Sequence, residues 1–268
     1  MRAYWPAVHI PGAVIAQEGE TIPEADNYIW QKSFNLDFIK ADQEVCHEHR
    51  HWWDICDPVW WFSPKEVARL LPYLAGIAFS SKGLRLDFAK NYQLDIPQHT
   101  IHDRLDLDHF PLKRNHEYTP VIRFIWYGIS INRIALHGAL TNLARLAANG
   151  YQIELTIMDD RPDQHLGKFD FPIYYTRWDL DKENAVLASH DIALLPPYPG
   201  PWGKVKSDNK KHTALACGLP VTDGHGYSEL VTLVTDSDMR QRQAEAYPLE
   251  LFDVRKSAQV WEAILCRS

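Results

Sequence analysis

The sequence lacks the features that mark membrane-spanning proteins and exported disulfide-rich proteins. No apolar run approaches the ~20 residues that cross a bilayer, and the first residues, MRAYWPAVHIPG, contain no signal-peptide core. The four cysteines, Cys46, Cys56, Cys217 and Cys266, form no disulfide framework in a chain of 268 residues. These absences predict a cytoplasmic protein with reduced thiols and no membrane span.

Positive charge is also scarce. The chain has 28 lysines and arginines against 35 acidic residues, a formal net charge of −7. This balance argues against a broad face for nucleic acid or for an anionic membrane, although it leaves room for a local basic site. The ten tryptophans are numerous. Such side chains suit stacking on bases or sugars, but they fill cores equally well.

A metal-binding pattern is missing as well. Cys46, His47, His49, His51 and Cys56 are metal-binding residue types. Their spacing fits no closed structural zinc site, because such sites pair ligands at short, regular separations. We therefore expect no metal.

What the chain does contain is an alternation of short apolar strands and helical segments, with a polar segment at 111–120 as the predicted linker. This alternation predicts an α/β protein with parallel sheets and right-handed crossovers. It also predicts two domains, residues 1–118 and 119–268. The expected strands lie around 7–10, 28–30, 52–56, 75–80, 100–101, 121–127, 151–158, 173–175, 192–195 and from 221. The expected helices lie at 36–44, 64–74, 81–92, 132–149, 180–189, 207–217, 225–236 and the chain end.

The stretch DIALLPPYPGPWGKVKSDNKKHTALACGLPV, residues 191–221, carries the strongest local pattern. A buried strand is followed by a loop of prolines and glycines at 196–203. Ser207 and Asp208 offer N-cap oxygens for a helix that Gly218 ends. Strand, loop, helix and next strand form a βαβ unit. In a βαβ unit the helix begins at the carboxyl edge of the sheet, where doubly wound α/β folds bind ligands.

Four lysines crowd the start of that helix: Lys204, Lys206, Lys210 and Lys211. Free amides, the positive end of the helix dipole and several ammonium groups together predict an anion site, most simply for phosphate. The alternative is a capped helix with solvated lysines.

The order DIALLP, loop, KSDNKK, helix, ACGLPV resembles the C-terminal domain of GT-B glycosyltransferases of the family-4-like group (glycosyl transferases group 1). The first half resembles a shortened N-terminal domain of such enzymes. The resemblance implies two Rossmann-like domains whose parallel sheets face a cleft, with the N-terminal domain reduced. It also implies a nucleotide-diphosphate sugar held by the second domain, and a chain end that packs back across the cleft. The usual glycine-rich first turn is not evident, Gly12 being its one candidate.

The resemblance assigns donor binding to three parts of the second half. Gly128, Ser130 and Asn132 form the turn after the first strand of the second half, with Arg133 as the nearest cation; an ordinary turn is the alternative. Trp178 is placed to stack on the nucleobase, unless it is a core residue. From the lysine-rich stretch come Lys204, Lys206, Ser207, Asn209, Lys210 and Thr213, with Lys206 and Lys210 as the main diphosphate ligands.

One departure from the family concerns a pair of glutamates in many retaining members. Their positions hold Val205 and Thr213 here, so the stereochemical outcome stays open. A base for an inverting reaction should then come from the first half. Asp54, Asp57, His102 and Asp103 lie at predicted strand ends there, where a carboxylate or imidazole can deprotonate an acceptor hydroxyl. The alternative for each is a structural or solvated side chain.

The resemblance thus implies a metal-independent glycosyltransferase that uses a nucleotide sugar as co-substrate and no further cofactor. The acceptor stays open between a glycan, a small molecule and a modified nucleic-acid base, the last not indicated by the net charge. Two alternatives remain. The protein binds a nucleotide sugar without catalysis, or it is a sugar-nucleotide epimerase of GT-B fold.

Overall fold

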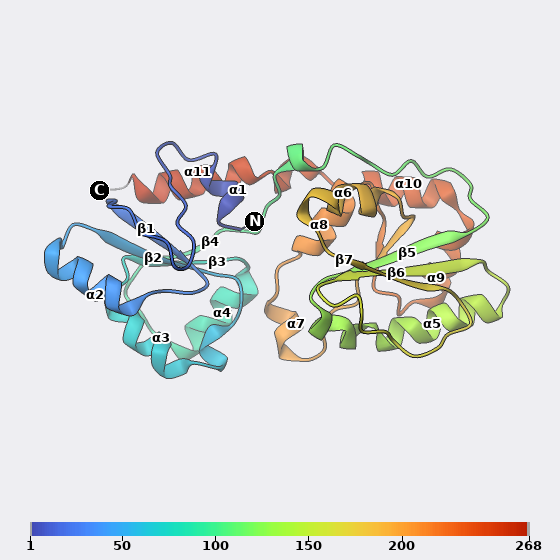
Figure 1. Cartoon of the computed structure of the whole chain (residues 1–268), viewed down its shortest axis with the longest axis horizontal. Coiled ribbons are helices and arrows are strands. Elements are labelled where there is room, and N and C mark those ends of the chain that lie inside the picture. Colours follow the sequence, from blue (N-terminus) through green and yellow to red (C-terminus); the bar gives the residue numbers. More distant parts are fainter. Residues whose placement is uncertain (1, 267–268) are drawn as a thin grey trace. The chain divides into compact units, whose positions relative to one another are not determined.

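A computed structural model describes residues 2–266 (Figure 1). It divides into two compact units. The first comprises the described residues up to Arg104, Gly200–Asp208 and those from Asp253 onward; the second comprises Leu105–Pro199 and Asn209–Phe252. Within the described part of the chain, no helix combines the length and the apolar content that a membrane crossing requires.

The first unit is built on a four-stranded parallel sheet in the order β1-β2-β3-β4. Its strands are β1 (Asn27–Gln31), β2 (Arg50–Ile55), β3 (Gly76–Phe79) and β4 (Gln98–Thr100). Its helices are α1 (Tyr4–Ala7), α2 (Leu36–Val45), η1 (Val59–Trp61), α3 (Pro64–Leu70), η2 (Leu71–Tyr73), α4 (Lys82–Asn91), α7 (Pro201–Val205) and α11 (Val254–Leu265).

Successive strand residues of this sheet point to opposite faces, so each face has its own core. Trp53 and Ile55 pack with α2, α3 and α4 on one face. Trp52 packs on the other face against Trp261 and Ile264 of α11. Figure 1 shows these layers, with α1 and α11 on the face opposite α2–α4. The end of the chain therefore covers the sheet formed by its beginning.

Local signals explain where several of these helices begin. The Asn35 side chain accepts a hydrogen bond from the Phe38 amide at 3.0 Å, and the Ser81 hydroxyl accepts one from the Leu84 amide at 3.0 Å. Both are N-caps that satisfy amides left open in the first helical turn. The predicted strand at 7–10 is wrong, because Tyr4–Ala7 form a helix whose turns continue through residue 10.

The second unit contains a five-stranded parallel sheet in the order β7-β6-β5-β8-β9. Its strands are β5 (Ile122–Tyr127), β6 (Ile153–Asp159), β7 (Ile173–Arg177), β8 (Ile192–Leu194) and β9 (Val221–Thr222). Its helices are η3 (Leu107–His109), η4 (Ser130–Leu136), α5 (His137–Ala148), α6 (Leu180–Ala188), α8 (Asn209–Ala216), α9 (Tyr227–Thr235), α10 (Ser237–Glu245) and η5 (Leu249–Phe252).

The strand order reverses between β5 and β8. The chain winds from β5 outward through β6 to β7, then returns to place β8 on the other side of β5. The main core lies between the sheet and helices α5 and α9, through residues such as Phe124, Leu143 and Leu230. Figure 1 shows α6 and α8 on the opposite face. The carboxyl ends of β5 and β8 therefore form the topological switch point at which doubly wound folds bind ligands.

The two units divide the chain differently from the predicted domains. The segment expected as linker, 111–120, lies within the second unit. There the Leu112 amide donates to Asn184 Oδ1 at 2.8 Å, and the Arg114 guanidinium pairs with the buried Asp191 carboxylate at 2.6 Å. Residues 200–208 and 253–266 belong to the first unit. Part of the predicted loop at 196–203 is helix α7, which Pro201 opens at a position that suits proline.

Gly224 gives a test of packing in the second unit. Its φ is +75°, and an added Cβ would lie 2.6 Å from Leu194 Cδ1 and 2.7 Å from Ala139 Cβ. Gly150 has a similar φ of +87° with no atom near its would-be Cβ. Both alanine variants incur the cost of positive φ, but only Gly224→Ala also overpacks the core, a cost of about 1–3 kcal/mol.

We therefore expect urea denaturation to give Gly224→Ala a free energy of unfolding about 2 kcal/mol below that of Gly150→Ala. Equal losses in the two variants would show that the contact with Leu194 and Ala139 relaxes without cost.

Candidate functional site

Gly128 and Lys210 meet at the switch point of the second sheet. Gly128 follows β5 directly, and a Cβ built on it would lie 2.3 Å from Lys210 Nζ. Any side chain at position 128 would therefore displace the ammonium group. The same ammonium lies 5.3 Å from the centre of the Trp126 ring, within range of a cation–π interaction. Gly128 and Lys210, which were predicted from separate patterns, thus lie together. The lysine ammonium group beside the backbone of Gly128, which carries no side chain, is called the cationic corner below.

The first turn of α8 belongs to this corner. The helix begins at Asn209, and the buried Tyr127 hydroxyl donates to the Lys210 carbonyl. This bond ties the helix start to the end of β5. The amides of the first helical turn have no partners within the helix, so they suit an anion.

Thr213 lies on the buried side of α8. Its hydroxyl donates to the Asn209 carbonyl at 3.1 Å, and the residue is 4% exposed. The Thr213 hydroxyl is therefore not accessible for the contact with a ribose that was predicted for it.

The turn after Gly128 already holds an anionic group. The Ser130 amide donates to Asp160 Oδ1 at 2.6 Å, and the Ser130 hydroxyl donates to Oδ2 at 3.3 Å. The hydrogen bond from the Ser130 amide lowers the pKa of Asp160. Asn132 lies half-buried in the same turn, with its amide bound to the Ile129 carbonyl at 2.8 Å. A turn whose amide favours a carboxylate favours other anions too.

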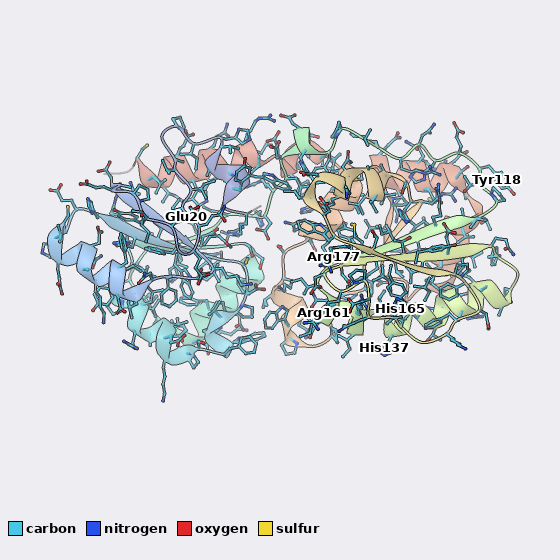
Figure 2. The ribbon with its side chains drawn as sticks, viewed as in Figure 1. Glu20, Tyr118, His137, Arg161, His165 and Arg177 are labelled. Carbon is cyan, nitrogen blue, oxygen red and sulfur yellow. The ribbon has the colours of Figure 1, made fainter. Side chains whose placement is uncertain are left out.

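Arg133 does not fit the role predicted for it. Its guanidinium is buried and grips the fully buried Asp159 carboxylate with Nε and Nη2, the second bond at 2.8 Å. Nη2 also donates to the Arg161 carbonyl at 2.6 Å, and Nη1 donates to that of Gln164. These bonds direct the guanidinium into the protein. Arg133 therefore anchors the loop after β6, which carries Arg161 and His165 (Figure 2).

Trp178 follows β7 at the same edge of the sheet. Its amide donates to the Asp159 carbonyl at 2.9 Å, and its indole Nε1 donates to Glu183 Oε1 at 3.0 Å. The residue is 37% exposed, so part of the ring reaches the surface. Stacking of a nucleobase on this ring remains a prediction.

In the first unit, Arg2 lies between two of the predicted catalytic carboxylates. Its guanidinium pairs with Asp54 of β2 and with Asp103, and it donates to the Ile101 carbonyl at 3.0 Å. Burial raises the pKa of Asp54 to about 6, although Arg2 opposes the shift. Burial lowers the pKa of Arg2, but its two carboxylate partners outweigh that effect and raise it. Ser207 donates its hydroxyl to Asp103 as well, so this serine does not cap α8.

Asp57, the third predicted carboxylate, is shared by two lysines. Lys32 lies 3.1 Å away, and Lys206 forms a second ion pair. Burial acts to raise the pKa of Asp57, but the two ammonium groups outweigh it and lower that pKa.

Segment Gly200–Asp208 is fixed to the carboxyl edge of the first sheet. The Ser81 hydroxyl donates to the Val205 carbonyl at 2.6 Å, and the Val205 side chain enters the core of the first unit. Lys204, Lys206 and Ser207 thus belong to the first unit, whereas Asn209, Lys210 and Thr213 belong to the second. The predicted donor residues are therefore divided between the two units.

Several polar groups in these clusters could not be predicted from local sequence patterns. Arg2 and Lys32 reach their partners through the tertiary fold, and nothing in the local pattern marks them. Glu183 was detectable in principle, because it lies one helical turn before the buried Leu187 on α6. Among residues 2–266, no group of three or more His, Cys, Asp or Glu side chains is placed to hold a metal ion.

No protein-family model and no curated protein matches the sequence. Solved structures do match the fold. HepE from Anabaena, in complex with UDP and glucose, is 11% identical with a TM-score of 0.64, over 91% of this chain and 78% of that chain. TarM from S. aureus, with UDP among its ligands, is 11% identical with a TM-score of 0.61, over 86% and 54%. The UDP-forming trehalose-phosphate synthase of Burkholderia vietnamiensis is 10% identical with a TM-score of 0.59, over 88% and 73%.

These similarities confirm the predicted GT-B fold, with its two Rossmann-like parallel sheets. At such low identity they establish the fold alone. The chain spans 54% of the matched Gap123 chain from Streptococcus agalactiae and 54% of the matched TarM chain.

Proposed function

We propose that this protein is a glycosyltransferase whose second unit binds a nucleotide-diphosphate sugar at the carboxyl edge of its sheet. The observation that carries the proposal is the Lys210 ammonium held against Gly128, beside the first turn of α8. Backbone without a side chain, an ammonium group and the amides of a helix start, all at a switch point, suit a diphosphate. Solved relatives in fold were crystallised with UDP or UDP-glucose, which supports the proposal.

The chemistry follows from charge. When the glycosidic bond to the donor breaks, the nucleoside diphosphate leaves with concentrated negative charge. Lys210 and the α8 amides are preorganised to stabilise that charge, and such groups are most effective when they need no rearrangement during the reaction. The sugar would pass to an acceptor hydroxyl without a metal ion.

The base that accepts the hydroxyl proton is proposed to come from the first unit. Asp54 and Asp103 are buried and ion-paired with Arg2, and the lysines beside Asp57 make it a weak base. His102 is exposed, and partial burial of its ring together with Arg104 lowers its pKa. A neutral imidazole at pH 7 is a competent base, so His102 is favoured over the three carboxylates.

Turnover tests the proposal. The protein is incubated with UDP-, GDP-, ADP-, CDP- and TDP-sugars, each with and without mixed glycans, polyols and nucleosides, and free nucleoside diphosphate is quantified. We expect one donor to release diphosphate in a way that depends on an acceptor. Donor conversion without acceptor indicates an epimerase, and binding without conversion indicates an inactive binding protein. Either outcome overturns the transferase assignment.

A further inference from the structure

Three consecutive residues at the end of β5, Trp126, Tyr127 and Gly128, all lie against Lys210. The Trp126 ring centre is 5.3 Å from the Lys210 ammonium group, and a Cβ on Gly128 would lie 2.3 Å from it. Trp126 and Tyr127 point to opposite faces of the sheet, as neighbouring strand residues do. Trp126 belongs to the core beneath α5 and α9, whereas the Tyr127 hydroxyl donates to the Lys210 carbonyl on α8. The Lys210 side chain therefore crosses the carboxyl edge of the sheet at Gly128, while its backbone is held by Tyr127.

Tyr127 makes a second hydrogen bond to α8. Its hydroxyl accepts from the Ala214 amide in addition to donating to the Lys210 carbonyl. In a regular α-helix these two backbone groups, four residues apart, pair with each other. The phenol therefore bridges the carbonyl and the amide of one turn at the start of α8. A side chain inserted in this way bends a helix and fixes where it bends.

The Tyr127 hydroxyl keeps its proton and so remains a donor. The residue is 4% exposed, and burial, together with the nearby Cys217 and Glu183 groups, raises the pKa of Tyr127 well above its ordinary value. A buried hydroxyl without a partner is costly, so the two bonds favour the one arrangement of α8 that satisfies it. Tyr127 thus sets the position of the start of α8 relative to the end of β5.

We propose that Tyr127 is a positioning residue for the donor diphosphate, which holds the amides of the first turn of α8 at a fixed distance from the cationic corner. This rests on the proposed function. The corner and the helix amides would bind the leaving diphosphate together, yet they come from segments far apart in the sequence. Groups that stabilise charge in a transition state must be held within about 0.5 Å of the productive geometry. Tyr127 is buried, so it acts on the diphosphate only through α8.

Tyr127→Phe is the informative variant, because it removes the hydroxyl and keeps the ring. The Lys210 carbonyl and the Ala214 amide can then pair with each other, so we expect a melting temperature within about 3 °C of the wild type. Calorimetry with UDP, GDP, ADP, CDP and TDP should show about tenfold weaker binding of the diphosphate that the wild type binds, since small misplacements have large effects. Turnover of the matching nucleotide sugar should lose more in kcat than in KM, because the charge on the leaving diphosphate is greatest in the transition state.

Tyr28→Phe is the matched control. Tyr28 is 8% exposed and its hydroxyl accepts from the Ala25 amide at 3.1 Å, but it lies in the first unit. This variant should leave diphosphate affinity and kcat unchanged, whatever its melting temperature.

The outcomes separate this inference from the proposed function. If Tyr127→Phe binds the diphosphate as tightly as the wild type, whatever its melting temperature, Tyr127 is a structural residue and the inference fails alone. An equal loss of affinity in Tyr28→Phe overturns it as well. If no diphosphate binds the wild type, the proposed donor site is absent and both proposals fail together.

Discussion

Replacing Arg133 by methionine is expected to lower the free energy of unfolding by about 3–5 kcal/mol. The substitution leaves the Asp159 carboxylate, which is 0% exposed, without its cationic partner. It also removes the donors that the Arg161 and Gln164 carbonyls use. Removing one member of a buried pair is far more costly than removing both, because the remaining charge is still shielded from water. Urea denaturation of the two proteins measures the difference.

Arg161→Met is the matched control. The Arg161 side chain is 61% exposed and lies 3.9 Å from Asp160, so its loss should change the free energy of unfolding by less than ~1 kcal/mol. A different result would support the role in binding the donor phosphates that the sequence predicts for Arg133. If Arg133→Met kept its stability and lost nucleotide binding, the guanidinium would serve the donor phosphates directly.

Replacing Arg2 by methionine is expected to destabilise the protein by about 3–5 kcal/mol at pH 8, and by less at pH 5. Arg2 is the cation shared by Asp54 and Asp103. Without it, the buried Asp54 carboxyl group favours its protonated form more strongly. A carboxyl group whose pKa is higher in the folded than in the unfolded state loses stability as pH rises between those two values. In the wild type, Asp54 is expected to cause this loss of stability up to its pKa of about 6.

In Arg2→Met the pKa of Asp54 in the folded state rises further, so the free energy of unfolding continues to fall to higher pH. The gap between variant and wild type should therefore widen from pH 5 to pH 8. Lys32→Met is the control, since Lys32 is 59% exposed and shares Asp57 with Lys206. It should cost less than ~1 kcal/mol. A gap for Arg2→Met that stays constant with pH would show that the effect comes from lost packing and not from the two carboxylates.

Much of the fold could be predicted because its signals are local. Asn35 and Ser81 mark helix starts that the structure confirms. Apolar runs such as 121–127 mark buried strands. No local signal indicates to which unit residues 200–208 belong. Their place depends on the Ser81 hydroxyl and on Val205 entering the first core, both long-range contacts. A continuous βαβ pattern along the chain gave no indication that this segment belongs to the other unit.

The candidate site shows the same division between local and long-range information. Gly128 and Lys210 were each found from a βα pattern, and the topology of the sheet brought them together. Arg133 was predicted to assist at the turn after Gly128, but its guanidinium pairs with Asp159. Predicting that pair requires knowing which face of η4 is buried. The aspartates at the strand ends of the first unit were found, whereas the Arg2 and Lys32 cations that occupy them were not.

The claim that the second unit holds a nucleoside diphosphate is tested most directly by thermal unfolding with UDP, GDP, ADP, CDP and TDP. Wild type, Lys210→Met and Lys182→Met are compared, the last because the Lys182 side chain is 76% exposed on α6. A ligand that binds only the folded state stabilises it by about 2.7 kcal/mol at 100 times its dissociation constant. We predict that at least one diphosphate raises the melting temperature of the wild type and of Lys182→Met, and that Lys210→Met loses that increase. No increase with any diphosphate, or an undiminished increase in Lys210→Met, would contradict the account.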